Sequence, residues 1–300
     1  MHRTRGTILT DQVSALVLIN RAKAPNAGLA AAALSAAGLV ATIETVDGDA
    51  IADRARRAVR EGASLVIIGG GDGTVGAAAG ALAGSGTALG ILPMGTLNHF
   101  ARDLGIPADP GEAARIIAAG RMARIDVAEV NGRTFVNNSA IGIYPQMVLD
   151  RDGQRERLGR STRLAMLVAA LRTLWRFHDR RLRLSADTGA MSVDTPLLFV
   201  GNNDYALAFP GAGRRERLDD GRLSVFVLRK KSAPGLVAAA FRALVGMTRS
   251  DDMVRFDAAR WLRVDSTRPR LTVSADGETI ELEPPLEYRI RPGALAVVVP

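Results

Sequence analysis

The first part of the chain alternates short apolar runs with alanine-rich or amphipathic segments. The apolar runs, which are typical of buried strands, lie at 13–19, 40–46, 64–69 and 87–92. Between and after them, the spacing of apolar positions predicts helices over 26–37, 49–61, 75–82 and 109–120. Strands that alternate with helices form parallel sheets, so this part of the chain is predicted to be an α/β domain.

The pattern changes after residue 121. Two runs of alternating polarity, 124–130 and 133–137, surround Asn131-Gly132, a strong signal for a tight β-hairpin turn. Further strands are predicted over 192–200, 261–264, 270–274 and 279–282, with one helix over 233–248. We therefore predict an α/β domain over residues 1–125 and a β-rich domain over 126–300, with return of the last strand to the first domain as an alternative.

The segment 155–184 is basic and is predicted to be helical. Its leucines recur at three- and four-residue spacing, and arginines occupy many of the positions between them. A cationic amphipathic helix can lie on an anionic lipid surface, or it can cover the protein's own sheet. The sequence leaves both interpretations open.

Composition argues against several kinds of site and partner. There is no cysteine and the three histidines are far apart in sequence, which argues against disulfides and against a Cys- or His-cluster metal site. No apolar stretch approaches the roughly 18 residues of a membrane span, so we expect a cytoplasmic protein or one peripheral on the inner membrane face. The formal net charge of +8 suits an anionic membrane surface, and the low aromatic content of 4% argues against nucleic acid as a partner. The pattern predicts no particular oligomeric state.

The apolar run at 64–69 continues directly into Gly69-Gly-Gly-Asp-Gly-Thr74 and then into a predicted helix. Backbone N–H groups in such a loop, together with the helix N-terminus, can bind phosphate. The loop lacks the lysine of the Walker type and the third glycine of the dinucleotide fingerprint. A carboxylate at Asp72 would repel a polyphosphate unless a cation lay between them, so Mg²⁺ is predicted here. A glycine-rich turn with a solvated aspartate is the alternative.

A second loop follows the next predicted strand. It reads Pro93-Met-Gly-Thr-Leu-Asn-His99 and again offers a glycine and a hydroxyl at the end of an apolar run. Because the carboxyl ends of parallel strands meet at one edge of a sheet, the two loops are predicted to lie in neighbouring crevices.

The two loops together resemble the diacylglycerol kinase catalytic-domain family, which includes bacterial lipid kinases, sphingosine kinases and ceramide kinases. The matching stretches are Gly70-Gly-Asp-Gly-Thr74 and Leu89-Gly-Ile-Leu-Pro-Met-Gly-Thr-Leu-Asn-His-Phe-Ala-Arg102. The resemblance implies an α/β nucleotide-binding domain of the NAD kinase/diacylglycerol kinase type followed by a β-rich, sandwich-like domain. It also implies Mg²⁺-dependent transfer of the γ-phosphate of ATP to a lipid hydroxyl, as on diacylglycerol or a sphingoid base. The implied nucleotide contacts are Thr45, Gly70, Gly71, Asp72, Gly73, Thr74, Gly95, Thr96 and Asn98.

Two later markers extend the resemblance. Arg217-Leu-Asp-Asp-Gly-Arg222 implies a structural Mg²⁺ bound by Asp220 and by the main-chain carbonyls of Arg217 and Arg222. A plain type I turn with solvated acids is the alternative for that stretch. Asp276-Gly-Glu278 implies that one carboxylate accepts the proton of the lipid hydroxyl while the other holds Mg²⁺, and the sequence does not choose between them.

The chain departs from the family pattern at two places. The family usually carries Asn-Pro-x-Ser-Gly after the first strand, and only Asn20 matches here. Family members often have Asn-Asp where this chain has Asn98-His99, and an imidazole cannot replace a carboxylate as a ligand for a hard cation.

Two other functions therefore stay open. An NAD kinase-like enzyme would share the first loop, although it would not be expected to combine the second loop with the late Asp-Gly-Glu. A catalytically weak regulator that binds nucleotide or lipid is suggested by His99 and by the poor match after Asn20.

Overall fold

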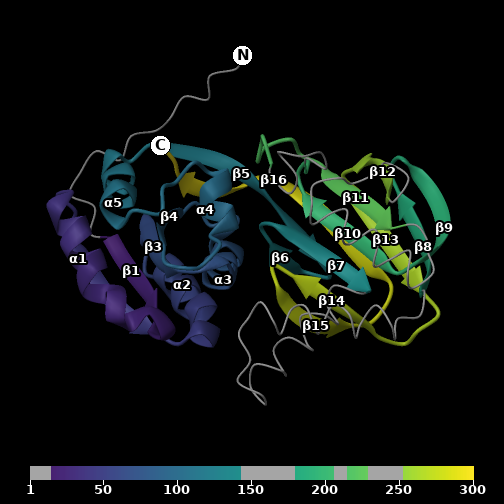
Figure 1. Ribbon diagram of the computed structural model, residues 1–300, viewed down its shortest axis with the longest axis horizontal. Helices are drawn as coiled ribbons and strands as arrows, with labels where there is room; N and C mark the ends of the chain where they lie inside the picture. The colour runs from purple at the N-terminus through teal and green to yellow at the C-terminus, as the bar shows by residue number, and fades with distance from the viewer. Residues whose placement is uncertain (1–14, 143–179, 206–214, 229–252) are drawn as a thin grey trace. The chain divides into compact units, whose positions relative to one another are not determined.

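The computed structural model describes residues 15–142, 180–205, 215–228 and 253–300 (Figure 1). The chain divides into two compact units. The first comprises residues 1–127, 134–137 and 291–300, and the second comprises 128–133 and 138–290. The long strands β5 (Met122–Val130) and β16 (Leu286–Val298) contribute residues to both units.

A parallel sheet forms the centre of the first unit. Its strands run in the order β2-β1-β3-β4, and the C-terminal end of β16 pairs in parallel with β4. The bounds are β1 (Ala15–Asn20), β2 (Ala41–Val46), β3 (Leu65–Gly70) and β4 (Ala88–Pro93). Every residue of β3 and β4 is buried, as their apolar sequences predict. The α/β prediction is confirmed.

Helices connect these strands along the chain. They are η1 (Arg21–Asn26), α1 (Ala27–Ala36), η2 (Gly48–Ala50), α2 (Ile51–Arg60), α3 (Asp72–Leu82), α4 (His99–Asp103) and α5 (Pro110–Ala119). Helix α5 shows how the sequence sets both ends: Asp109 caps the N-terminus by accepting a hydrogen bond from the Glu112 N–H at 2.8 Å, and Gly120 ends the helix with φ of 65°. Helix α3 begins earlier than predicted, at Asp72, so that its first turn belongs to the glycine loop.

The second unit is built from strands, which confirms the prediction of a β-rich domain. One sheet has the order β12-β11-β10-β7-β14-β15 and is antiparallel throughout. Its strands are β7 (Asn138–Gly142), β10 (Leu197–Asn202), β11 (Leu223–Leu228), β12 (Met253–Ala259), β14 (Leu271–Ala275) and β15 (Glu278–Leu282). In the other group β9 (Gly189–Thr195) pairs with β8 (Arg180–Ala186), β8 with β13 (Trp261–Ser266), and β13 with the N-terminal end of β16.

The predicted hairpin at Asn131-Gly132 is confirmed. It joins β5 to β6 (Arg133–Phe135), and both turn residues have positive φ, 46° and 78°. Asn131 also accepts a hydrogen bond from the Glu287 N–H at 2.7 Å, so the turn is tied to β16.

Two secondary-structure predictions in this unit are wrong. The helix predicted over 155–184 does not extend to the last residues of that range, which form β8. In β8 Leu182 and Leu184 are buried while Arg181 and Arg183 are exposed, which is the two-residue period of a strand. The helical spacing of leucines before β8 obscured this period. The single strand predicted over 192–200 is two strands, β9 and β10, separated by Pro196, which has no N–H to donate to a sheet. Residues 155–179 and the helix predicted over 233–248 lie outside the described residues.

A buried hydrogen bond links two strands of the second unit. The fully buried Tyr288 of β16 shares a 3.1 Å hydrogen bond with Ser139 of β7. Burial raises the pKa of Tyr288, so its hydroxyl stays neutral and links the two strands.

Over the described ranges, no helix is both long enough and apolar enough to cross a membrane.

Candidate functional site

The two glycine loops of the first unit lie against each other. Strands β3 and β4 pair in parallel up to Gly70 and Pro93, and the Met94 N–H donates to the Gly70 carbonyl at 2.9 Å. A Cβ added to Gly95 would lie 2.6 Å from the Cα of Gly71, closer than real Cβ contacts allow. The structure therefore brings the loops together as the sequence predicts, and only glycine permits their close approach.

Asn98 shapes the second loop from within. It has φ of 48°, and its amide oxygen accepts from the Gly95 N–H while its amide nitrogen donates to the Gly95 carbonyl, both at 2.9 Å. Thr96, between these residues, is exposed. The side chain of Asn98 is thus engaged in holding the loop closed, whereas the hydroxyl of Thr96 is accessible.

Asp72 connects the two loops. As the first residue of α3, it accepts a 3.1 Å hydrogen bond from the Phe100 N–H, in the first turn of α4, through Oδ1. Its second oxygen, Oδ2, has no hydrogen-bond partner within the described part of the chain. One carboxylate oxygen therefore fixes the loop geometry, and the other can face a cation.

Asn20 also contacts the first glycine loop, although no role for it was predicted from the sequence. It lies at the end of β1, where its amide nitrogen donates to Thr74 Oγ1 at 2.9 Å and its amide oxygen accepts from the Ala22 N–H at 2.9 Å. Thr74 in turn fills the space beside Gly70, where a Cβ would lie 2.6 Å from that of Thr74. Thr45, one strand away, pairs with Ile19 near the end of β2 and is exposed.

The contact between the loops predicts opposite effects for two glycine substitutions. Gly95→Ala is expected to destabilise the protein by a few kcal/mol, because its methyl group would overlap Gly71 and the Asn98 oxygen at 2.6 Å. Gly73→Ala has nothing within 4 Å and lies in the first turn of α3, so its stability should equal or exceed that of the wild type. Urea denaturation of the three proteins measures both effects. Equal midpoints for Gly95→Ala and the wild type would show that the loops do not pack as described.

His99 does not replace the carboxylate that the family usually carries. Its side chain is exposed and its Nδ1 lies 2.9 Å from a terminal nitrogen of Arg102. A guanidinium can only donate, so Nδ1 is the acceptor and the ring proton resides on Nε2. In this arrangement the Nε2–H is the hydrogen-bond donor of the ring.

In the second unit, Asp276 and Glu278 have different surroundings. Asp276 and Gly277 form the turn between β14 and β15 with φ of 48° and 86°. The Asp276 N–H donates to the Asn138 carbonyl at 2.9 Å, and its Oδ1 accepts from the Asn138 N–H at 3.3 Å. Glu278 has a side chain that is 58% exposed and makes one long ion pair with Arg133, at 3.5 Å. The turn therefore ties one carboxylate to β7 and leaves the other accessible.

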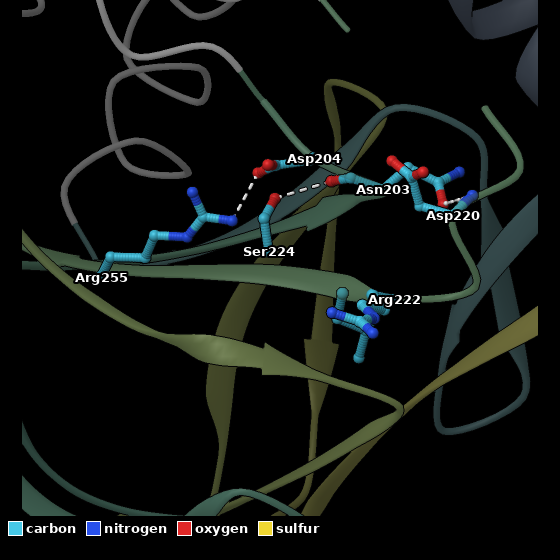
Figure 2. A pocket seen from close by; sticks show the side chains of 7 residues that line it. Asn203, Asp204, Asp220, Arg222, Ser224 and Arg255 are labelled. Carbon is cyan, nitrogen blue, oxygen red and sulfur yellow. Dashed lines mark hydrogen bonds and ion pairs between the residues drawn. The ribbon is translucent and has the colours of Figure 1, made fainter. Parts of the chain in front are cut away.

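Asp220 lines a separate pocket of about 300 Å³ in the second unit (Figure 2). Its N–H donates to the side-chain oxygen of Asn203 at 3.0 Å, and the Arg222 carbonyl accepts from the Asn203 N–H at the same distance. Arg217 lies close to Asp219 and Asp220, at 3.0 and 3.3 Å. The side chain of Asp220 is 28% exposed, so its carboxylate is accessible from the pocket.

The residues at both places fit a hard cation that binds through few carboxylates. Within the described ranges, no three His, Cys, Asp or Glu side chains gather as a metal cluster. A Mg²⁺ near Asp72 would draw its other ligands from phosphate and water, and one near Asp220 would draw them from carbonyls and water. The Arg222 carbonyl has accepted one hydrogen bond and retains a second lone pair for that purpose.

Comparison with known proteins places this geometry in context. Residues 14–130 match the diacylglycerol kinase catalytic domain, and residues 149–299 match the YegS C-terminal NAD kinase beta sandwich-like domain. A "Probable lipid kinase YegS-like" of Pseudomonas aeruginosa is 33% identical over 97% of this chain and 95% of its own length. A "Diacylglycerol kinase" of Staphylococcus aureus is 27% identical over 77% of this chain and 73% of its own. The crystal structure of a diacylglycerol kinase from Bacillus anthracis, 21% identical, shares the fold with a TM-score of 0.70 over 99% of this chain and 98% of that one.

Proposed function

Because the chain belongs to the diacylglycerol kinase catalytic-domain family, with a YegS-type C-terminal domain, we propose that it transfers the γ-phosphate of ATP to a lipid hydroxyl. The observation that carries this proposal is the pair of interlocked glycine loops that Asp72 joins at the ends of β3 and β4. Phosphoryl transfer requires a positioned polyphosphate, cations that spread its charge and a group that accepts the proton of the acceptor. The two units offer residues for each of these tasks.

The first unit is proposed to bind the nucleotide. Backbone N–H groups of Gly70, Gly71 and Gly73 and the N-terminus of the eleven-residue helix α3 face the phosphates. The hydroxyls of Thr45, Thr74 and Thr96 supply further hydrogen bonds, and Asn98 holds Gly95 in place. The Oδ2 oxygen of Asp72 is assigned to Mg²⁺, which when bound with ATP would neutralise charge on the β- and γ-phosphates.

Glu278 is proposed as the proton acceptor. Its exposed carboxylate is accessible to a lipid hydroxyl, whereas the carboxylate of Asp276 is bonded to the main chain of Asn138. In the transfer step, the hydroxyl oxygen bonds to the γ-phosphorus, the bond from that phosphorus to the leaving oxygen of ADP breaks, and the proton passes to Glu278. Asp276 then shapes the turn that carries Glu278 and is the other candidate ligand for Mg²⁺.

A second cation is assigned to the pocket in the second unit. Asp220 with the main-chain carbonyls of Arg217 and Arg222 forms an oxygen-rich set that suits Mg²⁺. We assign this site a structural role rather than a role in the chemistry.

The acceptor is proposed to be a lipid at an anionic membrane surface, where the net charge of +8 favours a peripheral association of the enzyme. Diacylglycerol is the first candidate, because a relative from Staphylococcus aureus bears the name diacylglycerol kinase. The protein is assayed with Mg²⁺ and ATP on diacylglycerol, a sphingoid base and ceramide in separate mixed micelles. A parallel reaction contains NAD in place of the lipid. Phosphorylation of one lipid supports the proposal and names the acceptor; phosphorylation of NAD alone would overturn it.

A further inference from the structure

Asn203 connects the end of β10 to the turn that contains Asp220. It is fully buried and has φ of 66°, a left-handed backbone that Asn, Asp and Gly tolerate better than other residues. Its N–H donates to the Arg222 carbonyl at 3.0 Å, and its carbonyl accepts from the Ser224 hydroxyl at 2.7 Å. Its side-chain oxygen accepts from the Asp220 N–H at 3.0 Å, as Figure 2 shows. One residue thus fixes the main chain on both sides of Gly221.

The side-chain amide of Asn203 also carries a buried donor for which the described part of the chain offers no acceptor. Because its Oδ1 accepts from the Asp220 N–H, the other amide atom is the NH₂ group. This nitrogen is buried and has no hydrogen-bond partner in the part of the chain that the structure describes. A buried donor without an acceptor costs about 1–3 kcal/mol, so Asn203 is held at a cost in stability beside the pocket that Asp220 lines. Asn203 lines that pocket together with Asp204 and Asp220.

The charges around the pocket make Asp220 the carboxylate that is easiest to engage. Asp204 forms a 2.8 Å ion pair with Arg255, and the guanidinium of Arg255 also lies over the ring of Phe226. Arg217 lies 3.3 Å from Asp220, but its side chain is 64% exposed, and an exposed ion pair of this kind contributes about 0–1 kcal/mol. A divalent cation can therefore displace Arg217 from Asp220. With one carboxylate available, cation affinity must depend strongly on how the neighbouring carbonyls are held.

We propose that Asn203 is the positioning residue of a divalent-cation site at Asp220. Its side-chain oxygen sets the main chain of Asp220, and its N–H sets the carbonyl of Arg222. The inference rests on the proposed assignment of Asp220 and Arg222 as Mg²⁺ ligands and adds the residue that arranges them.

The test removes the amide while keeping the backbone. Asn203→Gly retains the left-handed conformation and both main-chain hydrogen bonds but loses the bond to the Asp220 N–H. Mg²⁺ is titrated without nucleotide, with the melting temperature as one readout and Mn²⁺ binding by electron paramagnetic resonance as another. The midpoint for Asn203→Gly is expected to rise roughly 10–100-fold, the range typical of residues that orient metal ligands.

Asn131→Gly is the matched control. Asn131 is also an asparagine of positive φ, 46°, whose side chain accepts a main-chain hydrogen bond, from Glu287 at 2.7 Å. It does not line the pocket. This variant is expected to melt at a lower temperature and to keep the wild-type Mg²⁺ midpoint, which separates loss of stability from loss of cation affinity.

The remaining outcomes distinguish the inference from the assignment beneath it. A wild-type midpoint in Asn203→Gly would overturn the role of Asn203 and leave the Asp220 site intact. A wild-type protein that does not respond to Mg²⁺, or a full response in Asp220→Asn, would overturn the site itself. Lipid phosphorylation is measured in a separate assay, which distinguishes failure of this site from failure of the proposed function. If Asn203→Gly does not fold, Asn203→Asp keeps the acceptor oxygen and must bind Mg²⁺ at least as tightly as the wild type; weaker binding contradicts the inference.

Discussion

Replacement of Asp72 by alanine is expected to lower lipid phosphorylation by at least about 100-fold, the scale of losing one group that stabilises charge in a transition state. Two losses contribute to the effect. The variant removes the oxygen assigned to Mg²⁺, and it removes the acceptor of the 3.1 Å hydrogen bond from the Phe100 N–H. The second loss alone would disturb the contact between the glycine loops, so alanine by itself does not separate chemistry from structure.

Asp72→Asn separates the two contributions. An asparagine oxygen can still accept from the Phe100 N–H, so the loops should stay joined and the melting temperature should remain near that of the wild type. Without the negative charge, however, the cation is bound poorly and activity should fall almost as far as in Asp72→Ala. Initial rates at saturating ATP and the melting temperature of each variant measure the two effects. Activity near the wild-type level in Asp72→Asn would mean that Asp72 only fastens the loops.

Glu278→Gln should produce the second large effect, a fall in kcat of about 10²–10⁴-fold, which is typical for loss of a general base. The side chain is 58% exposed and its one ion pair, to Arg133, is long, so folding should be unaffected. The rate is measured with saturating lipid and ATP, and the melting temperature is recorded alongside.

Asp276→Asn is the control for Glu278→Gln. Asparagine tolerates the positive φ of 48° and still accepts from the Asn138 N–H, so the turn should persist. A smaller loss of kcat is expected than in Glu278→Gln. If Asp276→Asn were the more severe variant, the proton acceptor would be Asp276 and the assignment made from the surroundings of the two carboxylates would be reversed.

Much of the first unit could be predicted from the sequence, because there local signals and tertiary structure agree. The runs that form β3 and β4 are apolar throughout and are buried throughout. The loops that follow these strands require glycine where Gly71 and Gly95 meet, so the glycine-rich pattern indicated a close approach of the two loops.

In the second unit, errors arose where local signals compete. Strand β8 follows a segment with helical leucine spacing, and its alternation of buried Leu182 and Leu184 with exposed arginines covers too few residues to outweigh that spacing. The break between β9 and β10 falls at Pro196, and the two strands belong to different sheets.

The sequence predicts which residues are candidates for the site, but it does not predict how the surroundings of those residues differ. Asp276 and Glu278 are two residues apart, which in an extended strand would point both carboxylates the same way; the turn at Asp276-Gly277 gives them different surroundings. Asn20 and Asn203 carry no local signal for their roles, because these depend on hydrogen bonds to Thr74 and Asp220, residues distant in sequence.

Transfer of labelled γ-phosphate from ATP into a total bacterial lipid extract, in mixed micelles with Mg²⁺, tests the central claim most directly. The Asp72→Ala variant at equal concentration serves as the blank. The account predicts label in the organic phase with the wild-type protein, migrating as one phosphorylated lipid class, and a signal at least about 100-fold lower with the variant. Absence of organic-phase label above that blank, from a wild-type protein that still binds ATP, would contradict the assignment of this chain as a lipid kinase.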